Sequence, residues 1–338
     1  MFTHPTAVGF FPASSNVSSC VGPTTLVLFI LLTLQAFAGS TEQEQLLEAR
    51  QLGNQGKFAQ ERVILDSLVH SDPAALDDAN RGMAWNTLGT LHMLMGDNEE
   101  SRRCYENAIR LLRKLPEASR AYASALANLG SLEMSLHQFD AAETPLRKAQ
   151  EIDLKAADHV GLQEVAMYRA NFAITRNDMR AARRFLADAF READQVKDLS
   201  LRDRATMYSV AGRLAAKTKD FAAAAGNYQQ SINFWTQACG ATCYFVGVES
   251  AFQADVYREL GDYRKAEEDI TKALGLTGQA VGQNAPLYAA MEIIHARVLR
   301  AMGSKAEAAE QEADAKQRLD AMRQRQCNDC SISALGFR

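Results

Sequence analysis

The stretch Leu260-Gly261-Asp262-Tyr263-Arg264-Lys265-Ala266-Glu267 has the pattern of a helix end, a tight turn and the start of a second helix. Gly261 suits the left-handed position that closes a helix, because it has no Cβ to clash there. The Asp262 side chain can accept a hydrogen bond from the free amides of the next helix. Tyr263 begins the buried side of that helix, and Ala266 is small enough to let another helix approach. The stretch therefore predicts a helical hairpin.

The same turn recurs at six other places in the chain. These are Gly56-Lys57-Phe58, Gly96-Asp97-Asn98, His137-Gln138-Phe139, Asn177-Asp178-Met179, Lys219-Asp220-Phe221 and Gly303-Ser304-Lys305. When the turns are aligned, units start at 42, 82, 123, 163, 205, 247 and 289, in steps of 40, 41, 40, 42, 42 and 42 residues. A fixed period in this range is typical of a solenoid. No stretch shows the alternation of a strand, so we expect seven stacked hairpins and no sheet.

Three positions of the repeat test this alignment. Position eight holds Ala49, Gly89, Gly130, Ala170, Gly212, Ala254 and Ala296. Position twenty holds Glu61, Ser101, Ala142, Ala182, Ala224, Ala266 and Ala308, and position twenty-seven holds Leu68, Ala108, Ala149, Ala189, Ser231, Ala273 and Ala315. Small side chains at fixed places on both helices allow close helix packing.

Three segments carry a resemblance to a known family: Trp85…Leu88-Gly89…Gly96-Asp97…Ala108, Leu129-Gly130…Phe139…Ala142…Ala149 and Gly261-Asp262-Tyr263…Ala266…Ala273. They resemble tetratricopeptide repeats. The family period is about 34 residues, and the excess here is close to two helical turns, which lengthens the helices without changing their inner face. The resemblance covers residues 42–322 and implies an all-α, right-handed α-solenoid of about seven hairpins, followed by a tail at 323–338.

The region before the repeats contains an apolar run from Leu26 to Leu34, followed by Ala36-Phe37-Ala38-Gly39. A run of this length is too short to span a bilayer comfortably. With a small-residue site behind it, the segment 1–38 resembles a secretory signal cleaved after Ala38, atypical because no basic residue precedes the run. We expect an exported protein, in the periplasm, the cell envelope or the extracellular medium, which meets a membrane only through this segment if it stays uncleaved.

The composition excludes several classes of function. With 47% hydrophobic and 23% charged residues among 338, the chain is globular, and its net charge of −4 argues against a nucleic-acid binder. The sequence shows no nucleophile elbow, no glycine-rich phosphate loop and no His-Glu-x-x-His motif. We therefore expect no catalytic activity and no cofactor.

The cysteines form two close pairs, Cys239 with Cys243 and Cys327 with Cys330. An oxidising compartment favours a local disulfide within each pair. Unpaired thiols, a four-thiolate zinc site and redox activity follow as alternatives, in that order, and the last two would make this a cysteine-based metal-binding or redox protein. Cys104 falls on a helix and is expected to be a buried thiol.

In the family that the repeats resemble, the first helix of each hairpin lines a concave groove and contacts partner peptides. Position nine of this helix is polar in all seven units. Carried over position by position, the candidate groove residues are Asn86, Thr90, Asn171, Arg213, Lys217, Arg258, Arg297 and Arg300. Because basic residues prevail in the C-terminal half, we expect an acidic or carboxylate-bearing ligand there.

These features predict a non-catalytic scaffold or adaptor that binds a protein or peptide partner in its groove. Two alternatives stay open from the sequence. The polar residues of the first helices could simply be the wetted part of a curved surface, since such residues are mostly exposed in any case. The protein could also be a cell-envelope assembly factor that contacts its partners by its convex face.

Overall fold

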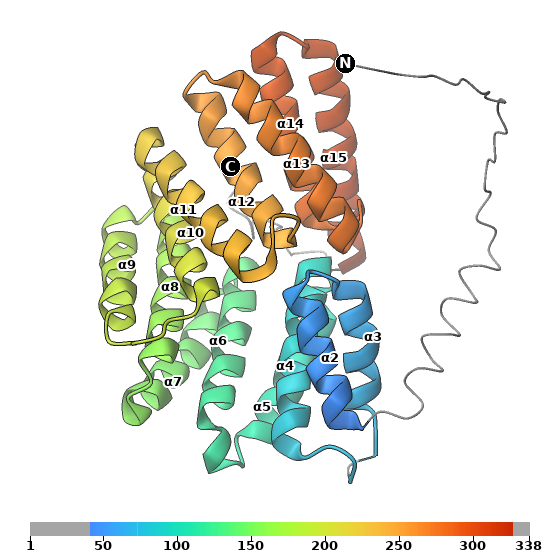
Figure 1. Ribbon diagram of the computed structural model, residues 1–338, viewed down its shortest axis with the longest axis vertical. Helices are drawn as coiled ribbons and strands as arrows, with labels where there is room; N and C mark the ends of the chain where they lie inside the picture. The colour runs from blue at the N-terminus through green and yellow to red at the C-terminus, as the bar shows by residue number, and fades with distance from the viewer. Residues whose placement is uncertain (1–40, 73, 327–338) are drawn as a thin grey trace, which may run out of the picture. The chain divides into compact units, whose positions relative to one another are not determined.

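The computed structural model of the protein describes residues 41–72 and 74–326. This part of the chain contains fourteen α-helices and no strand (Figure 1). The helices form seven consecutive hairpins: α2 (Glu42–Asn54) with α3 (Phe58–Val69), α4 (Asp78–Met95) with α5 (Asn98–Leu112), α6 (Ser119–Ser135) with α7 (Phe139–Ala156), α8 (His159–Thr175) with α9 (Met179–Ala193), α10 (Leu201–Lys217) with α11 (Phe221–Cys239), α12 (Tyr244–Glu259) with α13 (Tyr263–Val281), and α14 (Pro286–Met302) with α15 (Lys305–Gln326). A short 3-10 helix, η1 (Pro116–Ala118), precedes α6. The prediction of an all-α solenoid of seven hairpins is confirmed.

The hairpins, numbered 1 to 7 in chain order, stack on one another. The second helix of each hairpin packs against the first helix of the next one, as in the pairs α3 with α4, α5 with α6 and α11 with α12. First helices also contact one another along the stack: α4 with α6, α6 with α8, α8 with α10, α10 with α12 and α12 with α14. The first helices from α4 to α14 therefore form one continuous row, which is the side expected to hold a groove.

Every hairpin turns through one residue in the left-handed conformation. The seven φ values are 73° at Gly56, 87° at Gly96, 60° at His137, 61° at Asn177, 62° at Lys219, 80° at Gly261 and 100° at Gly303. The amide of the next residue then donates to a carbonyl five positions back, as in the 2.9 Å bond from Asp262 to Tyr257. The same bond closes all seven turns, and it satisfies carbonyls that a helix end leaves free.

The three small-residue positions are buried in all seven hairpins. The glycines among them leave room for a larger side chain on the second helix. A Cβ added at Gly89 would lie 2.7 Å from the Tyr105 ring, and one added at Gly130 would lie 2.6 Å from Leu146. Nothing in a packed interior tolerates contacts this short. The recurring small residues thus set how closely the two helices of a hairpin approach.

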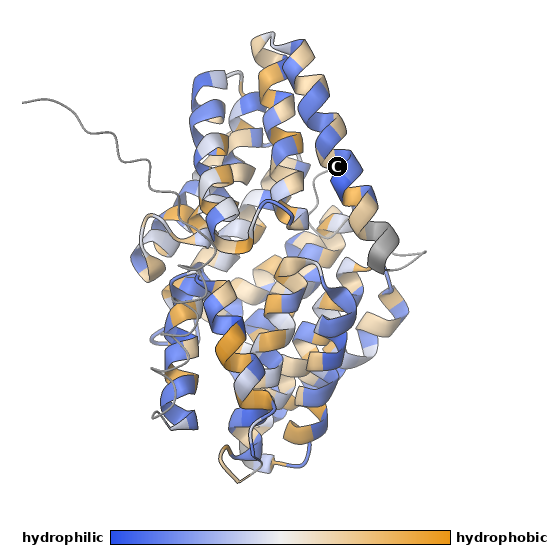
Figure 2. Cartoon of the chain, turned by 90° about the vertical axis from the view of Figure 1, so that its right-hand side faces the viewer, coloured by the Kyte–Doolittle hydropathy of each residue, from blue (hydrophilic) through white to orange (hydrophobic). Residues whose placement is uncertain are grey.

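Hydrophobic and hydrophilic residues are mixed along each helix in Figure 2, as expected for helices that bury one side. The last hairpin exposes much of α15, where Ala308 and Ala315 are the buried residues between 305 and 322. A terminal unit of a solenoid has one solvated side, so this polarity is expected. None of the helices between residues 41 and 326 is long and apolar enough to cross a membrane.

The first two hairpins also contact the last two, which the sequence analysis did not anticipate. Helix α3 contacts α13, and α4 contacts α14; Figure 1 shows the blue α3 close to the orange helices α12 and α13. The Phe58 ring lies edge-on to the Tyr244 ring, with centroids 5.0 Å apart. Nearby, Arg202 Nη1 donates to Asn54 Oδ1 at 2.7 Å. Hairpin 1 is therefore joined to hairpins 5 and 6.

Candidate functional site

First helices of the row, together with α3, border a half-open cavity of about 430 Å³, here called the hairpin 1 cavity. It is lined by residues of α2, α3, α4, α6, α10 and α12: Arg50, Gly53, Asn54, Phe58, Glu61, Asn86, Thr87, Thr90, Leu91, Leu94, Ser124, Arg202 and Phe245. Two of the predicted groove residues, Asn86 and Thr90, lie in this lining. A volume of this order holds a small ligand or a few residues of a peptide.

Hydrogen bonds fix the polar side chains of this row. Asn128 Nδ2 donates to Asn86 Oδ1 at 3.1 Å, and Asn128 Oδ1 accepts from the Tyr168 hydroxyl at 2.8 Å. Thr90 Oγ1 and the Tyr105 hydroxyl share a bond of 3.1 Å. These contacts connect first helices α4, α6 and α8, so the side chains are held in place before any ligand arrives.

A second cavity of about 240 Å³, here called the hairpin 5 cavity, lies farther along the row. Its lining combines basic, acidic and aromatic side chains: Arg213, Ala216, Lys217, Lys219, Phe221, Tyr228, Phe252, Asp255, Val256, Glu259 and Arg297. Arg213 Nη1 donates to Asn171 Oδ1 at 2.8 Å, which joins two predicted groove residues across α8 and α10. Burial lowers the pKa of Arg213 from its usual value.

The other predicted basic groove residues are engaged with acids of the protein itself. Arg258 Nε donates to Asp255 at 2.9 Å, and its Nη2 lies 2.6 Å from Glu259 Oε1. Arg300 donates to Glu312 of α15 at 2.6 Å. Arg297 Nη1 lies 3.8 Å from Asp255 Oδ2. The expected preference for an acidic ligand stays a prediction, and Arg213, Lys217 and Arg297 are the predicted residues that line the hairpin 5 cavity.

Glu249 is a buried carboxylate on α12, only 5% exposed. Burial raises its pKa to about 8, while hydrogen bonds from Ser209 and Ser231 and the charge of Arg213 act in the opposite direction. Its Oε2 atom has no hydrogen-bond partner among the described residues. The sequence analysis gave no role to this residue.

The site also contains Glu61, a residue that the sequence analysis listed but did not interpret. It is 4% exposed and lines the hairpin 1 cavity. Position twenty holds Ser or Ala in the other six hairpins, so the carboxylate is an exception at a packed position. A charged residue in a column of small buried ones was the signal available in the sequence.

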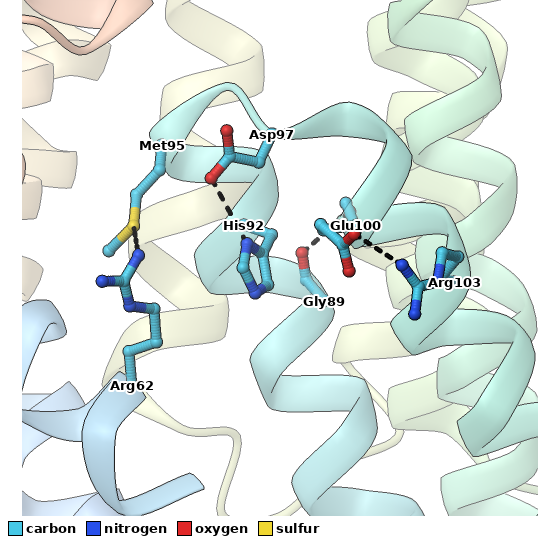
Figure 3. A network of polar contacts seen from close by, with 8 residues as sticks. Arg62, Gly89, His92, Met95, Asp97, Glu100 and Arg103 are labelled. Atoms are coloured by element: carbon cyan, nitrogen blue, oxygen red, sulfur yellow. Dashed lines mark hydrogen bonds and ion pairs between the residues drawn. The ribbon is translucent and has the colours of Figure 1, made fainter. Parts of the chain in front are cut away.

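The His92 side chain contacts Asp97, five residues later in the same hairpin (Figure 3). Its Nδ1 lies 3.4 Å from Asp97 Oδ2, beside the turn of hairpin 2. Close by, Arg62 Nη1 of α3 donates to the Met95 sulfur at 3.3 Å, which links hairpins 1 and 2. No three His, Cys, Asp or Glu side chains in the described part of the chain form a group that could hold a metal ion.

Cys239 is the last residue of α11, and Cys243 caps the start of α12. Cys239 and Cys243 have Cα atoms 5.7 Å apart and sulfur atoms at bonding distance. Cys243 directly precedes the first residue of α12, Tyr244, whose ring meets Phe58. Cys104 is buried, as expected. Cys327 and Cys330 lie outside the described residues, as does the segment 1–38.

A comparison with protein-family models identifies two segments of the chain. Residues 80–155 and residues 251–279 each match a family model described as tetratricopeptide repeat. A comparison with curated protein sequences finds no match.

Solved structures of similar fold include NprR in complex with its cognate peptide NprX, with a TM-score of 0.59 and 14% identity over 93% of this chain and 92% of that one. A Rap protein complexed with competence and sporulation factor has a TM-score of 0.57 and 14% identity, covering 89% of this chain and 85% of that one. BtubC (BKLC) from P. vanneervenii has a TM-score of 0.50 and 20% identity, covering 68% and 91%. At these identities the likeness establishes the fold alone.

Proposed function

We propose that this chain, which is a tetratricopeptide repeat protein, is an adaptor that binds an extended segment of a protein or peptide partner along its row of first helices. The hairpin 1 cavity is the observation that carries the proposal. First helices of hairpins 1, 2, 3, 5 and 6 all contribute to its lining, so a ligand there would contact most of the stack at once.

The chemistry of the lining supports a peptide ligand. Asn54, Asn86, Thr90 and Ser124 offer amide and hydroxyl groups that can pair with a peptide backbone. Leu91, Leu94 and the aromatic rings beside them offer apolar surface for side chains. Two proteins of similar fold, NprR and a Rap protein, were solved with a bound peptide or factor.

Peptide capture by the immobilised full chain tests the proposal. Arg50→Ala and Thr90→Ala remove lining groups, so we expect weaker retention of a short-peptide pool with unchanged helicity. Arg110→Ala is the matched control, because Arg110 is exposed on α5 and bonds only locally to Asn107. Equal retention by all three variants would place the contact elsewhere, for example on the second helices.

A second test addresses the expected preference for acidic peptides, and it changes Arg213, Arg297 and Arg300. We expect Glu at all three positions to reduce the capture of acidic peptides without unfolding the chain. Arg213 and Arg297 line the hairpin 5 cavity and Arg300 is not part of its lining, so the pair Arg213→Glu and Arg297→Glu should suffice. Unchanged capture of acidic peptides by this double variant would remove the hairpin 5 cavity from the proposal.

We further propose that the protein is exported and that Cys239 and Cys243 form a disulfide. The support is the signal-like segment 1–38 and the bonding distance between the two sulfur atoms. Mass measurement of alkylated protein with and without reductant tests both cysteines directly. Alkylation of Cys239 and Cys243 in unreduced protein isolated from the cell would contradict the disulfide.

A further inference from the structure

Glu61 occupies a place in the fold that packing does not explain. At position twenty, hairpins 3 to 7 carry alanine and hairpin 2 carries Ser101, whose hydroxyl donates to the Gly89 carbonyl at 2.8 Å. Glu61 puts a carboxylate into the same buried position of hairpin 1. Burying a carboxylate costs free energy unless a partner compensates it.

The fold makes room for this carboxylate instead of pairing it. Gly53 on α2 faces it, and a Cβ at that position would overlap the Glu61 carboxylate atoms. All six equivalent residues in the other hairpins are larger: Met93, Met134, Ile174, Ala216, Arg258 and Arg300. No hydrogen bond from the described residues reaches the carboxylate, and Arg202 is the only charge that acts on it noticeably.

The Arg202 guanidinium also contacts an amide and two aromatic rings. Its Nη1 bonds Asn54, and its guanidinium lies over the Trp235 and Phe245 rings, 5.8 and 5.7 Å from their centroids. Burial raises the pKa of Glu61 to about 7, and Arg202 lowers it only in part. The hairpin 1 cavity thus contains a buried carboxylate that could accept a hydrogen bond from a cationic group of a ligand.

We infer that the hairpin 1 cavity binds a primary ammonium group of the peptide ligand, with Glu61 as its carboxylate partner and Gly53 as the residue that makes space for it. The inference rests on the proposed function and names the chemistry at one end of the groove. An ammonium donates to the carboxylate, and the carbonyl groups that follow it can accept from Asn86 and from the exposed Arg50. The ammonium can come from a peptide N-terminus or from a lysine side chain.

Three pools of short peptides, all amidated at the C-terminus, separate these sources on the immobilised full chain. The first pool has a free N-terminus and no Lys or Arg; the second is N-acetylated without Lys or Arg; the third is N-acetylated and contains Lys. We expect the first or the third pool to be retained about tenfold better than the second, the difference made by one charged hydrogen bond. Retention of the first pool identifies the N-terminus, and retention of the third identifies lysine.

The variants Glu61→Ala and Glu61→Gln should abolish that difference. The exposed Glu106→Gln on α5 is the charge-matched control and should keep it. Thermal unfolding adds an independent readout: Glu61→Ala restores the residue of hairpins 3 to 7, so we expect a higher midpoint, whereas a purely structural carboxylate would give a lower one.

Three results would overturn the inference in distinguishable ways. Equal retention of all three pools above a blank surface would leave peptide binding intact and remove the ammonium. No retention of any pool would remove the proposed function, and the inference with it. A lower unfolding midpoint for Glu61→Ala would assign the carboxylate to the stability of hairpin 1.

Discussion

The Tyr228 ring packs directly on the backbone of Gly212. A Cβ added at Gly212 would lie 2.8 Å from the ring atoms Cδ1 and Cε1, and the ring is only 2% exposed. Hairpin 2 repeats the relationship with Gly89 and Tyr105. Hairpins 4 and 6 instead pair an alanine at position eight with Leu186 or Ile270 at position twenty-four. In both hairpins with a tyrosine at position twenty-four, position eight is therefore a glycine, whereas a leucine occurs with alanine in hairpin 4 and with Gly130 in hairpin 3.

Gly212→Ala should therefore destabilise the protein by about 1–3 kcal/mol, because the buried ring cannot move away. The double variant with Tyr228→Leu reproduces the pairing of hairpin 4. We expect it to lose less stability than the two single variants added together, by about 1 kcal/mol or more. Urea unfolding of the four proteins measures this coupling, and strict additivity would contradict the packing relationship.

Lys219→Gly should stabilise the chain by about 1 kcal/mol. Lys219 occupies the turn of hairpin 5 with φ of 62°, a conformation that costs a residue with a Cβ and not a glycine. Gly261→Ala is the reverse change at the equivalent turn, where nothing lies within 4 Å of the added Cβ. Thermal unfolding should move in opposite directions for the two variants, and a shift in the same direction would rule out a backbone cause.

Arg81→Met should destabilise the protein by about 3 kcal/mol and loosen the segment between α3 and α4. The Arg81 guanidinium is buried and donates to five carbonyl groups, those of Leu68, Val69, Ser71, Asp72 and Leu76, at 2.8 to 3.3 Å. Arg110→Met, at an exposed site, should change stability by less than about 0.5 kcal/mol. Hydrogen exchange across residues 68–81 measures the loosening, and unchanged protection there would show that water replaces the guanidinium.

Phe58→Ala should release hairpin 1 from hairpin 6. The ring is 3% exposed and meets the rings of Tyr244 and Phe245, so its loss should cost about 3 kcal/mol. We expect faster hydrogen exchange in α2, α3 and the start of α12. Phe139→Ala removes the ring at the same position of hairpin 3, where its partner Phe172 belongs to the adjacent hairpin. Faster exchange in α2 and α3 in both variants would mean that Phe58 has no special part in this contact.

The unfolding free energy should fall as pH rises from about 5 to 8. Burial raises the pKa of Glu249 to about 8, and the pKa values of Asp153 and Glu61 rise to about 7 for the same first cause. In this window the folded chain holds protons that the unfolded chain has already released, so folding becomes less favourable as pH rises. Each such group contributes a slope of at most about 1.4 kcal/mol per pH unit.

Glu249→Gln tests the assignment, because it removes the titrating group with the highest of these pKa values. Denaturant unfolding at several pH values should give a shallower decline above pH 7 than in the original protein. The exposed Glu268→Gln, whose carboxylate pairs with Arg264 at the surface, should leave the slope unchanged. A steeper decline in Glu249→Gln would reverse the sign argued here.

The sequence predicted the local geometry well because each hairpin repeats the same short-range pattern. Gly261 and its equivalents mark turns that close within six residues, and the small residues at position eight meet a side chain sixteen positions later. The expectation that the first helices line a groove came from the resemblance to tetratricopeptide repeats, and it stays a prediction. The pairing of Arg258 with Asp255 is also local, yet the sequence analysis assigned Arg258 to a ligand, because a basic residue on a helix does not reveal whether an acid of the protein already holds it.

The amino-acid sequence by itself determined the number of hairpins, their turns and the residues that pack within each one. Only the tertiary structure decided that hairpin 1 meets hairpin 6, and that Glu61 therefore lines a cavity shared with hairpins 5 and 6 and does not lie at a free end of the stack. Phe58 and Tyr244 are 186 positions apart. Their contact depends on small rotations that accumulate from hairpin to hairpin, and no short-range pattern specifies that sum.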